Sequence, residues 1–151
     1  TDEALNYFEE IIRLQPDTPE AIYQLGRILF QKGDSAAAVN YLRQAVRIAP
    51  GMAEAHDLLA YILATEERVR DPGGAVYYAR QASVLTGDRD PDVLATLALA
   101  YLAAGQASQA RRVADSALER AREQGDEDLV SRIQLRLESI NALSSTEQGE
   151  E

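Results

Sequence analysis

The 151-residue sequence contains no cysteine and no tryptophan, and it has only one histidine, one lysine and two phenylalanines. Without cysteine the chain cannot form a disulfide, a thiolate metal site or a thiol redox motif. The single histidine, His56, has no carboxylate or second histidine four residues away, so we expect it to serve packing rather than chemistry. With so few large aromatic residues, the core must be built from alanine, leucine, isoleucine and valine.

Positive charge is also scarce: the sequence has 15 basic and 25 acidic residues, and its net charge is −10. Nucleic-acid binding requires clustered lysine and arginine, so we expect no nucleic-acid partner. The longest apolar stretch, Val93–Ala104, is too short for a membrane span, which takes about 20 residues. We therefore expect no membrane insertion.

Motifs of catalysis and cofactor binding are missing as well. Gly73 and Gly74 lack the spacing and the following lysine of a phosphate-binding loop, and no serine lies in a nucleophile motif. Asp88, Asp90 and Asp92 alternate like the start of a calcium loop, but the glycine and glutamate that such a loop needs later are Val93 and Leu99 here. Capping of the next helix explains Asp90 and Asp92. We expect no metal, no other cofactor and no enzymatic activity.

The chain does contain a helical hairpin, between Pro19 and Pro50. Apolar residues recur there at helical spacing, on either side of a break at Gly33 and Asp34. Small residues stand where the two helix axes must come close: Gly26, Ala38 and Ala45. Proline and acidic residues mark the helix starts, as in Thr18-Pro19-Glu20, where Thr18 is expected to cap the first helix.

The hairpin pattern repeats with a period of 34 residues. Ala4, Phe8, Ile11 and Pro16 precede Ala38, Leu42, Ala45 and Pro50 by that distance, and Leu59, Ala60 and Leu63 follow Leu25, Gly26 and Leu29 by the same distance. A further copy contains Leu94, Leu97, Ala98, Tyr101, Gly105, Ala110, Ala114 and Ala117. Fixed periods of this length are typical of solenoid proteins, in which each repeat is one supersecondary unit.

These residues resemble the tetratricopeptide repeat family. Leu25-Gly26 matches its Leu-Gly pair, and Tyr101, Ala38, Ala110, Phe8, Pro16 and Pro50 match further positions, whereas its tryptophan is replaced by Ile22, His56 or Leu94. The resemblance implies an all-α fold, a right-handed superhelix (solenoid) of antiparallel helix pairs with a C-terminal capping helix. A longer loop at residues 66–74 resembles a variant of bacterial arrays.

The repeats predict one solenoid domain over residues 1–143, followed by a disordered tail at 144–151. Residues 1–16 are expected to be the second helix of an incomplete repeat, and 126–143 a single capping helix. The repeats between them are expected at 19–50, 53–87 and 91–124. Because the chain opens on a second helix, we expect it to be a piece of a longer protein.

In this family the first helices of the pairs form a concave lining on which peptides usually dock. The resemblance places the partner-binding groove at Glu20, Tyr23, Arg27, Glu54, Asp57, Tyr61, Asp92 and Leu99. The alternative is that the neighbouring Phe30 and Leu102 pack between repeats and that the acidic residues are solvated helix starts. The clamp that holds acidic chaperone tails is not expected, because Tyr23, Arg27, Leu58 and Thr96 occupy its places.

The predicted function is that of a non-catalytic protein–protein interaction module, a scaffold within a larger protein. Its partner is expected to be a protein or peptide with basic and apolar residues, which the acidic lining attracts. The alternative is self-association, giving a homodimer through the open N-terminal end of the array, where an apolar helix face lacks a partner helix.

Overall fold

The structure is a computed structural model that describes residues 2–147, and the regular elements in that range are helical. They are α1 (Asp2–Leu14), α2 (Pro19–Gln31), α3 (Ser35–Ile48), α4 (Ala53–Thr65), η1 (Glu67–Val69), α5 (Pro72–Leu85), α6 (Pro91–Ala103), α7 (Ala107–Glu123), α8 (Glu127–Arg136) and α9 (Glu138–Glu147). Apart from η1, a short 3₁₀ turn, all of these are α-helices.

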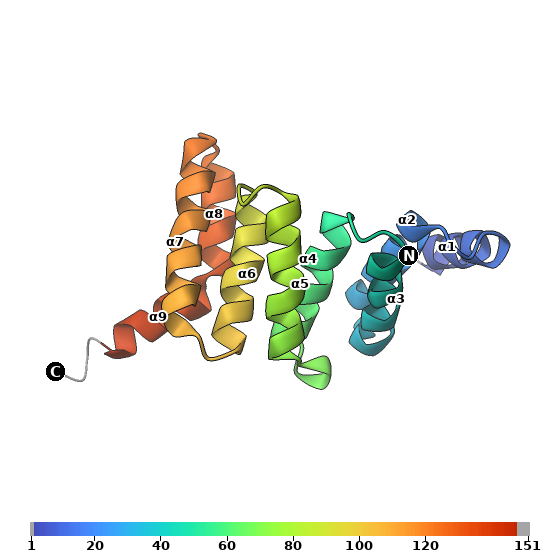
Figure 1. Ribbon diagram of the computed structural model, residues 1–151, viewed down its shortest axis with the longest axis horizontal. Helices are drawn as coiled ribbons and strands as arrows, with labels where there is room; N and C mark the ends of the chain where they lie inside the picture. The colour runs from blue at the N-terminus through green and yellow to red at the C-terminus, as the bar shows by residue number, and fades with distance from the viewer. Residues whose placement is uncertain (1, 148–151) are drawn as a thin grey trace.

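The helices form antiparallel pairs that stack in chain order. The principal pairs are α2 with α3, α4 with α5, and α6 with α7, and neighbouring pairs contact one another through α3–α4, α5–α6 and α4–α6. Figure 1 shows the helices side by side from α1 to α9, with α1 turned away from the direction shared by α4–α8. The all-α solenoid expected from the sequence is confirmed.

Capping side chains fix where four of these helices begin. Four aspartates accept hydrogen bonds from the first turns that follow them, namely Asp34 from Ala37 N–H, Asp71 from Gly74 N–H, Asp90 from Asp92 and Val93 N–H, and Asp126 from Leu129 N–H. Thr18 stands at the N-cap position of α2 as expected, but its hydroxyl donates to the Gln15 carbonyl at 3.0 Å and makes no cap bond. Pro19 at the first helical position needs no such partner.

The two helices of the first complete hairpin, α2 and α3, pack closely at Gly26. A Cβ placed on Gly26 would lie 3.0 Å from Leu42 Cγ and 3.4 Å from the Ala38 carbonyl oxygen, closer than ordinary van der Waals contact. Leu42 and Ala38 are both fully buried. The close approach of α2 and α3 predicted from the small residues is therefore confirmed.

The longer loop at residues 66–74 folds into the 3₁₀ turn η1 between α4 and α5. The backbone N–H of Asp71 donates to the Leu63 carbonyl at 3.0 Å, which returns the chain to the end of α4. Val69 packs against the core from this turn. The longer loop is thus accommodated locally, and the pairing of α4 with α5 is preserved.

The single capping helix expected at 126–143 is instead two helices. At Leu137 the backbone leaves helical geometry, with φ −97° and ψ 4°, and its N–H donates to both the Ile133 and Gln134 carbonyls. The bend lets Ile133, Leu137 and Ile140 all lie buried against the end of the solenoid. Residues 144–147, expected to begin a disordered tail, continue α9, while 148–151 lie outside the described residues.

Candidate functional site

A cavity of about 280 Å³ lies between α2, α4 and the start of α6, the first helices of three successive pairs. Five of the predicted groove residues line it: Tyr23, Arg27, Glu54, Asp57 and Asp92. Asp90 adds a further carboxylate, and Leu58 and Val93 contribute apolar surface. The first and last of these residues, Tyr23 and Val93, are 70 positions apart in sequence, and the stacking of the repeats brings them together.

The other three predicted groove residues lie elsewhere. Glu20 is exposed in the first turn of α2 and does not line the cavity. Leu99 is only 9% exposed, because it is packed in the core with α7, α8 and α9. Tyr61 is half-buried, and its ring meets the Phe30 ring edge-on at a centroid distance of 6.2 Å. The expected packing of Phe30 between repeats is thereby confirmed.

The cavity is strongly acidic. Four carboxylates, from Glu54, Asp57, Asp90 and Asp92, face it together with one guanidinium, from Arg27. Such a concentration of one charge in a hollow attracts cations and raises their local concentration.

Asp57 is the most perturbed group in the cavity. Its Oδ1 atom is buried and has no hydrogen-bond partner. Burial raises the pKa of its carboxyl to about 6, with the neighbouring charges of Asp90 and Asp92 acting in the same direction. The Thr96 hydroxyl and the Arg136 guanidinium oppose this rise.

Tyr23 is half-buried beside these acids. Burial is the main cause that raises the pKa of its phenol, and the nearby carboxylates of Glu54 and Asp57 add to it against the opposing charge of Arg27. At neutral pH the hydroxyl therefore stays protonated and can both donate and accept a hydrogen bond.

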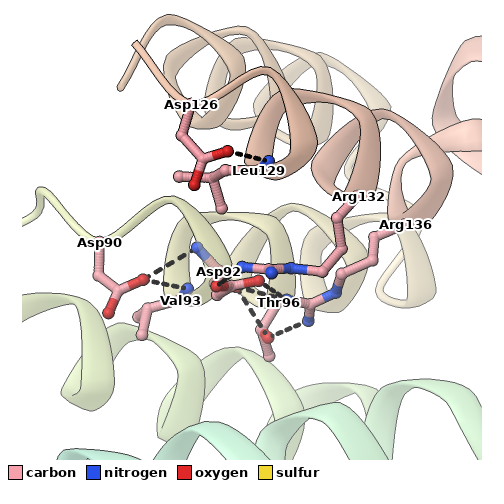
Figure 2. A network of polar contacts seen from close by, with 8 residues as sticks. All are labelled: Asp90, Asp92, Val93, Thr96, Asp126, Leu129, Arg132 and Arg136. Carbon is pink, nitrogen blue, oxygen red and sulfur yellow. Dashed lines mark hydrogen bonds and ion pairs between the residues drawn. The ribbon is translucent and has the colours of Figure 1, made fainter. Parts of the chain in front are cut away.

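A network centred on Asp92 borders the cavity on its α6 side (Figure 2). Arg136 Nη1 donates to Asp92 Oδ1 and to the Asp92 carbonyl, both at 3.0 Å, and Arg136 Nη2 donates to the Thr96 hydroxyl at 2.8 Å. Arg132 Nη2 donates to Asp92 Oδ2 at 2.9 Å. The Arg136 guanidinium also lies over the Tyr61 ring, 5.5 Å from its centroid.

This network was not predicted from the sequence. Arg132 and Arg136 lie one turn apart on α8, and α8 packs against α6, over the lining of the third repeat. Their spacing of four residues on a helix whose other face is apolar was the available signal. Their partners are 40 to 44 residues away, beyond any local pattern.

Metal and acid–base sites receive no support from the histidine. His56 is buried, its Nε2 lies 2.9 Å from the Pro50 carbonyl oxygen, and its ring packs at a tilt against Tyr78. The packing role expected for it is confirmed. Among the side chains that the structure describes, no three from histidine, aspartate or glutamate are arranged to hold a metal ion. Over residues 2–147 no helix has both the length and the apolar character needed to cross a bilayer.

Comparison with known sequences identifies the repeat. A family model described as tetratricopeptide repeat matches residues 1–62. Cellulose synthase 2 operon protein C of Komagataeibacter xylinus is 31% identical over 116 residues, which is 77% of this chain and 9% of that protein. Tetratricopeptide repeat protein 21B of Mus musculus is 34% identical over 62 residues, 41% of this chain and 5% of that protein. The chain thus spans less than a tenth of the length of either relative.

Solved structures share the fold at low sequence identity. MamA 41-end from Desulfovibrio magneticus RS-1 superposes with a TM-score of 0.72 at 19% identity, covering 96% of this chain and 86% of that one. TTC0263, a thermophilic tetratricopeptide repeat protein of Thermus thermophilus, gives 0.66 at 22% identity, with 96% and 80% covered. A chain of the CopN-Scc3 complex gives 0.64 at 20% identity, with 83% and 72% covered.

Proposed function

Because the chain belongs to the tetratricopeptide repeat family, we propose that it is a non-catalytic interaction module that holds a segment of a partner protein against α2, α4 and α6. Proteins of this family generally mediate protein–protein interactions. The module would act as a scaffold, with binding rather than chemistry as its contribution.

The composition of the cavity is the observation that carries this role. Its wall combines a half-buried tyrosine, Tyr23, with the apolar side chains of Leu58 and Val93 and with several carboxylates. Buried tyrosines dominate the energy of many interfaces, and a mixture of apolar anchors and peripheral charge is typical of peptide-binding grooves. We propose a partner segment with an apolar anchor flanked by basic residues.

A peptide array that varies charge and apolar content independently would test this function. We expect retention of basic peptides, with chemical-shift changes in a ¹⁵N-labelled protein confined to α2, α4 and residues 86–93. Tyr23→Ala should weaken binding, whereas Tyr77→Ala, an exposed tyrosine on α5, should not. Preference for acidic peptides, or shifts centred on α5 and α7, would contradict the proposed groove.

Self-association is a second candidate, and the character of α1 favours it. This helix has a strongly amphipathic sequence, DEALNYFEEIIRL, yet none of its residues is buried. Tyr7 and Leu14 are 63% and 67% exposed. Exposed apolar surface of this kind tends to be covered by another chain, and a second copy bound through α1 would supply that cover.

Sedimentation equilibrium over a wide concentration range would test self-association. We expect concentration-dependent dimers that Leu14→Ser weakens. The matched control is Leu135→Ser, because Leu135 on α8 is 65% exposed, and its substitution should leave the dimer intact. A monomer at every concentration, or equal loss with both variants, would rule out an interface at α1.

A further inference from the structure

We infer that the cavity between α2, α4 and α6 receives the side chain of an arginine from the partner, as a defined specificity pocket within the proposed groove. This inference rests on the proposed function and names the chemical group that the groove would read.

The size of the cavity suits one side chain. Its volume of about 280 Å³ falls just below the ~300–1,000 Å³ of pockets that enclose whole small molecules. Leu58 and Val93 offer apolar surface to the methylene stem of a long basic side chain, whose charged end would reach the carboxylates.

The charge of the cavity favours a cation, and its geometry disfavours a metal ion. Asp92 is already paired with Arg132 and Arg136, whereas Glu54, Asp57 and Asp90 are opposed only by Arg27 among the lining residues. Within the described part of the chain, no three such groups are close enough together to hold a metal. A guanidinium, whose charge is delocalised over several N–H donors, can contact carboxylates that are too far apart to bind one metal ion.

Asp57 gives the pocket its recognition group. Its carboxyl lies in the wall of the cavity, and one of its oxygens is buried without a hydrogen-bond partner. A buried acceptor without a donor is energetically unfavourable. A donor that hydrogen-bonds this carboxyl therefore contributes more binding free energy than it would at an exposed acid. A guanidinium would provide both donors and compensating charge.

Arginine fits better than lysine, because the same protein already binds a guanidinium beside this cavity. Asp92, which lines the cavity, binds the guanidinium groups of Arg132 and Arg136 through its two carboxylate oxygens, and Arg136 lies over the Tyr61 ring. Inside the cavity Tyr23 offers an aromatic ring near Asp57, a similar combination of carboxylate and ring. A planar guanidinium can hydrogen-bond a carboxylate and stack on an aromatic ring at the same time, which a compact ammonium does less well.

A neighbouring hollow provides the contrast. It has a volume of about 480 Å³ and lies between the start of α6 and the α7–α8 corner. Its acids Asp90, Asp92 and Asp126 are accompanied by Arg89 and Arg132, and the Arg132–Asp92 ion pair already satisfies part of the charge. In the cavity between α2, α4 and α6, no arginine or lysine forms an ion pair with Asp57 among the described contacts. We therefore place the partner's arginine there.

The test uses blocked single amino acids, which need no knowledge of the partner. N-acetyl-arginine N-methylamide, and its citrulline and lysine counterparts, would be titrated into the ¹⁵N-labelled full chain at constant ionic strength. We expect the arginine compound to shift the amides of residues 23–27, 54–58 and 90–93, and citrulline to shift none of them. Asp57→Asn should weaken the arginine compound about tenfold. Glu119→Gln, an exposed acid on α7, should not change it.

Each outcome decides the inference. Equal shifts with citrulline, tighter binding of lysine, or no shift at the solubility limit would overturn it. If the Asp57→Asn protein retains its spectrum and still binds arginine equally well, the pocket does not act through Asp57 and the inference also fails. Basic peptides that bind α2 and α4 in spite of any of these results would leave the interaction function intact. If the arginine compound binds but no peptide binds the groove, the arginine pocket stands and the proposed interaction function fails.

Discussion

The guanidinium carbon of Arg136 lies 5.5 Å from the centre of the Tyr61 ring, so a side chain from α8 reaches past α6 to contact α4. On the way the same guanidinium donates to Asp92 and Thr96 of α6. One residue therefore joins the C-terminal end of the solenoid to both preceding first helices. It also occupies one face of the Tyr61 ring and one carboxylate oxygen of Asp92.

Replacing Arg136 should loosen this end of the molecule. Its side chain is only 23% exposed, and hydrogen bonds to charged groups contribute about 1.5–3 kcal/mol each when one partner is removed. We expect Arg136→Ala to lower the free energy of unfolding by about 2–3 kcal/mol. Denaturant titration measures the loss, and hydrogen exchange should show reduced protection concentrated in α8.

Arg132→Ala is the matched control for Arg136→Ala. Arg132 binds the same aspartate from the same helix, but its side chain is 58% exposed. An exposed ion pair contributes about 0–1 kcal/mol, so the protein should lose little stability. Equal losses for the two variants would contradict the structural role assigned to Arg136.

Asp57→Asn should stabilise the protein at neutral pH. The pKa of Asp57 is raised from 3.8 to about 6 in the folded state, so folding takes up a proton between these values. The contribution of Asp57 to stability is therefore fully present below about pH 4 and is lost as the pH rises through about 6. A rise of about two in pKa corresponds to a loss of at most about 2.7 kcal/mol in the free energy of unfolding.

The pH dependence identifies the cause of that stabilisation. Asparagine keeps the shape of the side chain but cannot ionise, so the gain over the wild type should grow between about pH 4 and pH 6 and then level off. Urea titrations of both proteins at several pH values would measure it. The exposed Glu54→Gln on the same helix serves as the control, with a small change expected. A gain for Asp57→Asn that is the same in acid as at neutral pH would exclude ionisation of Asp57 as the cause.

Gly26→Leu should disrupt the first hairpin. Even a Cβ at this position would lie 3.0 Å from Leu42 Cγ, so a larger side chain must push α2 and α3 apart. Overpacking of a well-packed core costs about 1–3 kcal/mol, which would lower the thermal midpoint. Gly51→Ala is the control, since a Cβ there meets no atom within 4 Å. An unchanged midpoint for Gly26→Leu would contradict the tight packing of this pair.

The sequence predicted those features that depend on local spacing. The 34-residue period placed the helices within a few residues of their observed ends, and the small residues located the contact between Gly26 and Leu42. Capping aspartates such as Asp71 and Asp90 were also recognisable, because their partners are two or three residues away.

Features that depend on distant contacts were missed. Leu99 was placed in the lining by analogy with earlier repeats, but α8 and α9 pack over the third repeat and bury it. The turn at Leu137 serves the burial of Ile133 and Ile140 against α7 and α6, which no periodicity in residues 126–143 reveals. The raised pKa of Asp57 likewise arises from burial and from α6 and α8.

Arginine binding should weaken in acid, which ties the pocket to Asp57. The charged and titratable groups around this carboxyl are Tyr23 and Arg27 from α2, Glu54 from its own helix, the N-cap residue Asp90 and Asp92 at the start of α6, and Arg136 from α8. A bound guanidinium favours the ionised form, so the pKa of Asp57 in the complex must fall below about 6. Binding therefore releases a proton near that pH, and the affinity must decline below it.

We expect the dissociation constant of the blocked arginine to rise by up to about tenfold per pH unit below about pH 6, over the range between the bound and free pKa values. Titrations at neutral pH, near the pKa of Asp57 and about one unit below it, at fixed ionic strength, would measure this dependence. Asp57→Asn should bind more weakly at neutral pH and show a flatter profile, because the other acids remain. An identical pH profile in the wild type and in Asp57→Asn would mean that a different carboxylate receives the arginine.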